Sequence, residues 1–144
     1  MGAVPREPLR TMIARAIVVI VGLGDVLAGA ALLFTPCWFF DSVAPFGTYN
    51  AHFLGDAGAF LLPVGVGLMV AARDLSRFRS LVILGTAVSV LHFSIHLYGS
   101  LAHGESWRVT GAVAVQAVAM VGVVAFAKPR PASTTIPDSA FRRA

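Results

Sequence analysis

Four stretches of consecutive, mostly apolar residues constrain this chain more than any other feature of its sequence. They cover residues 14–34, 51–72, 80–98 and 109–127. A helix needs roughly 20 such residues to cross the hydrocarbon layer of a bilayer, which is about 30 Å thick. Each stretch must be helical, because backbone groups that face lipid find hydrogen-bond partners only within their own segment. The sequence therefore predicts an all-α protein, a four-transmembrane-helix antiparallel up-down bundle.

The composition supports a membrane protein and excludes other classes. Hydrophobic residues make up 57% of the 144 residues and charged residues only 12%, whereas a soluble domain carries about 25% charged residues. The net charge of +4 comes from few charges scattered around apolar blocks, so no nucleic-acid partner is expected. A single cysteine, Cys37, excludes a disulfide scaffold. The expected partner is the lipid bilayer.

The basic residues predict the orientation of the chain in the membrane. Lysines and arginines gather before the first stretch, between the second and third, and after the fourth, whereas only Arg108 lies on the other side. Positive charge marks the cytoplasmic side. We therefore expect a multi-pass protein of the cell inner (cytoplasmic) membrane with both termini in the cytoplasm. Residues 1–13 form a cytoplasmic segment, 14–127 the membrane domain, and 128–144, which are rich in Pro, Ser and Thr, a disordered tail.

Polar residues within the apolar stretches are the candidates for function. An ionisable group in lipid is unfavourable, by about 2.5–3.5 kcal/mol for Asp at mid-helix, and usually faces the bundle interior. All of these residues fall in the half of the membrane predicted to face outside. They are Asp25, His52, Asp56, His92 and His96, with Gln116 and Ser89 as uncharged companions. In the loop at 99–108, His103 and Glu105 are expected only to be solvated.

A metal site is the first interpretation of these residues. His52 and Asp56 are spaced i, i+4, and so are His92 and His96, so each pair shares a helix face. The pairs fall at similar depths on neighbouring antiparallel helices. Three imidazoles and a carboxylate at one point would suit tetrahedral zinc, or iron, manganese or copper with an added water. Expected outer-shell partners are Asp25, Gln116 and Ser89.

Three alternatives stay open. Haem b needs one histidine from each of two helices, such as His52 with His96 or with His92; it ranks below a bare metal, because two histidines one turn apart are redundant for one haem. A small transporter or membrane enzyme would use His and Asp for proton transfer on a membrane-soluble molecule. A network that only packs helices would belong to a structural or accessory subunit. Stripes of small residues would suit either a homo-oligomer or a partner in a membrane complex.

Two stretches of sequence are similar to a known group of proteins. WFFD at 38–41 with FGTYNAHFLGDAGA at 46–59, and HFSIH at 92–96, resemble small uncharacterised bacterial four-helix membrane proteins with a histidine-rich third span. The size and span count are more loosely similar to DoxX-like membrane proteins. The first resemblance implies the four-helix fold and no established activity. The second would imply a redox or quinone-linked role by analogy of architecture alone.

Overall fold

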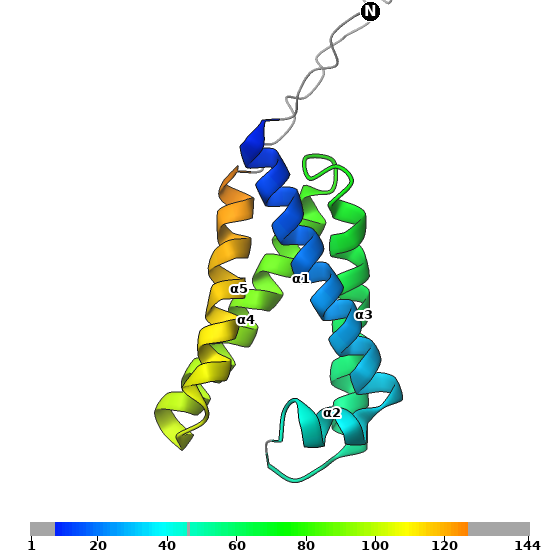
Figure 1. The fold of residues 1–144 in the computed structure, drawn as a ribbon, viewed down its shortest axis with the longest axis vertical. Helices are drawn as coiled ribbons and strands as arrows, with labels where there is room; N and C mark the ends of the chain where they lie inside the picture. Colours follow the sequence, from blue (N-terminus) through cyan, green and yellow to red (C-terminus); the bar gives the residue numbers. More distant parts are fainter. Residues whose placement is uncertain (1–7, 46, 127–144) are drawn as a thin grey trace, which may run out of the picture.

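The computed structural model describes residues 8–45 and 47–126, which form five helices (Figure 1). In chain order they are α1 (Leu9–Phe34), α2 (Pro36–Ser42), α3 (Ala51–Ala71), α4 (Arg79–His103) and α5 (Trp107–Phe126). Four of them, α1, α3, α4 and α5, are long and apolar enough to cross a membrane. The predicted all-helical class and the four membrane-length segments are therefore confirmed.

The helix boundaries differ from the expected apolar stretches in three places. Helix α1 begins at Leu9, within the segment expected to precede the membrane domain. The short helix α2 lies in a loop for which no helix was predicted. Helix α4 continues past Tyr98 to His103 and ends at Gly104, whose left-handed backbone (φ +68) stops the helix. Residues 1–7 of the expected N-terminal segment and the expected tail at 128–144 lie outside the described residues.

Helices α1 and α3 pack with their backbones in direct contact, because glycines face one another across the interface. A Cβ atom at Gly29 would lie 2.6 Å from the backbone nitrogen of Leu62, and one at Gly65 would lie 2.6 Å from that of Val26. A Cβ at Gly58 would in turn lie 2.8 Å from the Gly29 carbonyl oxygen. In a membrane, where helix association depends on van der Waals packing, such close approach stabilises the pair.

The buried apolar core lies at one end of the molecule, which we name the closed end. It draws residues from all four long helices and from the α3–α4 connection. They are Ala14, Val18, Leu68, Ala71, Ala72, Leu75, Val82, Met120 and Val123. Toward the opposite, open end, which carries α2 and the α4–α5 turn, the pair α1–α3 diverges from the pair α4–α5 (Figure 1). The two pairs therefore share one core only near the closed end.

The first testable prediction concerns the α1–α3 contact. We expect Gly29→Ala to lower the free energy of unfolding by about 1–3 kcal/mol, because the added Cβ overlaps a backbone that cannot move without separating the helices. The matched control is Gly24→Ala on the same helix, where no atom lies within 4 Å of the added Cβ. Denaturant unfolding in detergent micelles, followed by circular dichroism, compares the two variants. Equal stabilities would contradict the direct backbone contact.

Helix α2 carries an exposed cysteine that can report the orientation of the chain. The Cys37 sulfur lies 3.6 Å from Oδ2 of Asp41. The negative charge of Asp41 raises the pKa of the Cys37 thiol, because the carboxylate repels the thiolate and accepts a hydrogen bond from the neutral thiol. Since Cys37 is the single cysteine of the sequence, thiol labelling reports on the α2 end alone.

The second prediction uses this thiol. The basic residues predict that the α2 end faces outside, so a membrane-impermeant maleimide added to intact cells should label Cys37. Asp41→Asn should lower the pKa of the thiol and accelerate labelling at mildly alkaline pH, because a larger fraction is then thiolate. Cys37→Ser provides the unlabelled control. Labelling that requires prior permeabilisation of the membrane would reverse the predicted orientation.

Candidate functional site

The four residues expected to share one metal site lie in two separate pairs. On α3, Nε2 of His52 lies 3.5 Å from Oδ2 of Asp56, and the two side chains are 89% and 60% exposed. On α4, the Nε2 atoms of His92 and His96 lie 3.1 Å apart. Across residues 8–45 and 47–126, no three His, Cys, Asp or Glu side chains form a group that could hold a metal ion. The predicted convergence of all four residues is not found in the structure.

The divergence of the helix pairs explains this difference. Helix α3 runs alongside α1, and helix α4 runs alongside α5. Because these two pairs diverge, α3 and α4 separate toward the open end (Figure 1). The lengths of α3 and α4 set how close His52 and His96 lie to the open end. The angle between the α1–α3 pair and the α4–α5 pair sets how far apart the two residues are. Equal depth on adjacent helices is therefore not enough to bring side chains together.

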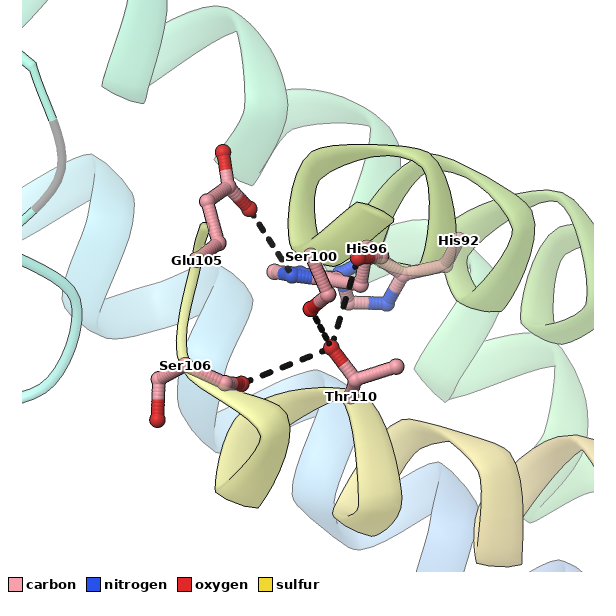
Figure 2. A network of polar contacts seen from close by, with 6 residues as sticks. All are labelled: His92, His96, Ser100, Glu105, Ser106 and Thr110. Carbon is pink, nitrogen blue, oxygen red and sulfur yellow. Dashed lines mark hydrogen bonds and ion pairs between the residues drawn. The ribbon is translucent and has the colours of Figure 1, made fainter. Parts of the chain in front are cut away.

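The histidine pair of α4 is joined instead by an acidic residue of the α4–α5 turn. Nδ1 of His96 lies 3.9 Å from Oε2 of Glu105 (Figure 2). The Glu105 carboxylate rests directly on Gly99, which has no side chain to displace it, and the Glu105 backbone N–H donates to the Gly99 carbonyl over 3.3 Å. Glu105 was expected only to be solvated. Two glycines in the sequence could have indicated this position of Glu105. Gly99 leaves space for the carboxylate, and Gly104 allows the chain to reverse direction after α4.

The contacts of His96 use opposite nitrogens of its ring. Nε2 lies within hydrogen-bond distance of Nε2 of His92, whereas Nδ1 lies 3.9 Å from Oε2 of Glu105, which is an ion-pair distance and too long for a hydrogen bond. The Glu105 side chain is 46% exposed and the His96 side chain 23%. His92 lies one turn, about 6 Å, farther along the helix toward the closed end. The three groups form a continuous chain of titratable side chains from the exposed turn into the span, which we name the Glu105–His96–His92 relay.

Two buried hydroxyls hold the turn that carries Glu105. The side-chain oxygens of Ser100 and Thr110 lie 2.6 Å apart and are buried between α4 and α5. The Thr110 hydroxyl also lies 3.3 Å from the carbonyl oxygen of His96 and 3.4 Å from that of Ser106, and it can donate its single proton to one acceptor at a time (Figure 2). This contact ties the first turn of α5 to the last turns of α4, and so positions Glu105 beside His96.

The residues expected as outer-shell partners form a second polar group at a different place. Asp25 of α1 is buried, with 8% of its surface exposed, and is hydrogen-bonded to Gln116 of α5. Gln116 Nε2 donates to Ser89 Oγ over 3.3 Å, and Ser89 donates to the Gly85 carbonyl over 2.9 Å. These hydrogen bonds link three helices across the membrane domain. This is the arrangement that a helix-packing network requires.

Comparisons with known proteins were made at three levels. No protein-family model, no curated protein and no solved structure matches this chain. The resemblance to small bacterial four-helix membrane proteins therefore stays a prediction. Function has to be argued from the geometry of the site itself.

The third prediction tests the hydroxyl pair that supports the turn. In a double-mutant cycle of Ser100→Ala and Thr110→Val, we expect a coupling free energy of about 0.6 kcal/mol or more, because hydrogen bonds between transmembrane helices average about 0.6 kcal/mol and reach about 1.7 kcal/mol. Ser94→Ala is the matched control, because the Ser94 hydroxyl donates to the Val90 carbonyl within its own helix. Unfolding in detergent supplies the free energies. Additive effects of the two substitutions would show that the pair does not join α4 to α5.

Proposed function

We propose that this multi-pass membrane protein takes up and transfers protons through the Glu105–His96–His92 relay, as a small transporter or a membrane enzyme. The observation that carries the proposal is the direct contact of two imidazoles, 3.1 Å between Nε2 atoms, with a carboxylate at the other nitrogen of His96. Imidazole is the side chain whose ordinary pKa lies closest to neutral pH, so such a chain of groups can exchange protons under physiological conditions.

The relay is not explained by helix packing. A packing network joins different helices, as Asp25, Gln116 and Ser89 do for α1, α5 and α4. By contrast, His92 and His96 lie on one helix, and Glu105 belongs to the turn that follows it, so their mutual contacts hold no two spans together. Ionisable groups within a span are unfavourable and commonly mark proton relays or ligand pathways. The placement of the relay therefore favours function over structure.

The fourth prediction concerns the contact between the two imidazoles, measured by nitrogen-15 NMR on histidine-labelled protein in lipid nanodiscs. We expect a scalar coupling across the hydrogen bond between Nε2 of His92 and Nε2 of His96, because the two atoms lie 3.1 Å apart. In the His96→Ala variant, this coupling should be lost and the ring N–H of His92 should exchange protons with water at least about tenfold more slowly, because its neighbour in the relay is missing. Glu105→Gln should also slow the exchange while leaving the coupling in place, because the carboxylate that accepts the proton is removed.

Two other histidines are internal controls for this experiment. His52 pairs with Asp56 on α3, and the His103 ring packs edge-on against Tyr98 with 5.5 Å between ring centroids, so the relay variants should leave both signals in place. Absence of the coupling between the two Nε2 atoms in the unmodified protein would overturn the proposal. Fast exchange of His92 in the His96→Ala variant would show that water reaches it without the relay.

A second candidate function is the binding of a divalent metal, and one specific observation favours it. Both Nε2 atoms of the histidine pair point to one place, and a carboxylate at Nδ1 of His96 is what commonly orients a metal-bound histidine. Zinc titrated into the same NMR samples separates the candidates. Stoichiometric binding that His92→Ala abolishes and His52→Ala preserves would favour the metal. Haem b gains no such support, because the two histidines in contact lie on one helix.

A further inference from the structure

An apolar groove of about 270 Å³ lies between α3 and α4. Its lining is Phe60, Pro63, Val64, Gly67, Leu81 and Leu84. None of these side chains carries a charge or a hydrogen-bonding group. The groove alone therefore suits the hydrocarbon part of a ligand.

The relay projects from the side of α4 that lines this groove. Leu81 lies beside Gly67 of α3, since a Cβ there would be 3.8 Å from Leu81 Cδ2, and a Cβ at Gly85 would be 2.7 Å from Leu68 Cδ2. These contacts define the α3-facing side of α4. His92 follows Gly85 by two turns and Leu81 by three, so it is rotated by about 20° from each of them. It therefore lies on the same side, about 11 Å from Gly85 along the helix toward the open end.

The opposing side of α3 presents aromatic rings toward the open end. Phe60, which lines the groove, is 77% exposed, and Phe53, two turns nearer the open end, is 57% exposed. His92 on α4 is also exposed. Asp56, whose side chain is 60% exposed, lies between these two rings, about 40° from Phe60 around the helix. Within the part of the chain that the structure describes, this side of α3 and His92 on α4 are therefore both uncovered.

We infer that this groove binds a lipid-soluble weak acid, a molecule with an apolar body and a single ionisable hydroxyl or carboxyl group. The inference rests on the proposed function and names its substrate class. The apolar body lies against Phe60 and Leu84, and the acidic group reaches the outward end of the groove beside His92. Two features of the site select this ligand. The apolar lining excludes a charged body, and the nearby imidazole accepts a proton.

The proton transfer balances without any further reactant. The O–H bond of the acid breaks and its proton bonds to Nδ1 of His92, the ring nitrogen that does not face His96. The proton on Nε2 of His92 moves to Nε2 of His96. The proton on Nδ1 of His96 moves to the carboxylate of Glu105 once a rotation of that side chain, or one bridging water, closes the 3.9 Å between Nδ1 and Oε2. One proton has entered at the groove and one has reached the exposed turn. The acid is left as its anion and Glu105 is neutral.

The fifth prediction tests binding in phosphatidylcholine nanodiscs. Dodecanoic acid and dodecylphenol represent two sources of the acidic O–H group, and methyl dodecanoate is the neutral control. We expect both acids, but not the ester, to shift the NMR signals of His92 saturably. Gly67→Leu fills the groove and should weaken binding by about tenfold or more, because the acid then buries less apolar surface. Gly24→Leu, on α1 where an added Cβ meets nothing within 4 Å, should leave it unchanged.

The outcomes separate this inference from the proposed function. If neither acid binds saturably while the coupling between Nε2 of His92 and Nε2 of His96 is present, the groove proposal is overturned and the relay stands. If that coupling is absent, the proposed function falls and the substrate class falls with it. Equal shifts by the methyl ester would make the groove a surface for acyl chains alone. Equal weakening by Gly67→Leu and Gly24→Leu would place the acid elsewhere.

Discussion

The contact between the backbones of α1 and α3 determines the shape of this protein. Glycines at 29, 58 and 65 let the two helices approach more closely than any side chain would allow. That pair then behaves as one unit and α4 with α5 as the other, joined by the apolar core at the closed end. Because the two units diverge from there (Figure 1), the side of α4 that begins against Leu68 ends uncovered at His92.

The polar residues divide into two groups with different physical roles. One group joins three helices near the middle of the membrane domain, where Gln116 is hydrogen-bonded to both Asp25 and Ser89. Hydrogen bonds of that kind fix the positions of helices in an environment that offers no water. The other group lies within a single helix, where Nε2 of His92 contacts Nε2 of His96. Their contact joins no two spans, and for this reason we assign it to the proposed proton transfer and not to helix packing.

The candidate site was predictable only where it depends on local geometry. The contact between His92 and His96 follows from their i, i+4 spacing, because residues one turn apart meet on any helix. The same rule correctly paired His52 with Asp56. The expected meeting of the two pairs is not found among the described residues, because α3 and α4 separate toward the open end (Figure 1). Glu105 was missed because its position depends on how the chain reverses at Gly104.

The sequence alone determined the number of spans and their lengths, because the hydrocarbon layer requires about 20 apolar residues for every crossing. It also determined which side chains share a helix face, since the helical repeat is the same in every environment. Only the tertiary structure decided which faces meet. That choice depends on the distance to which two backbones can approach, which is set by glycines on separate helices and by the turns that connect them. For this reason the relay ends at Glu105 and not at Asp56.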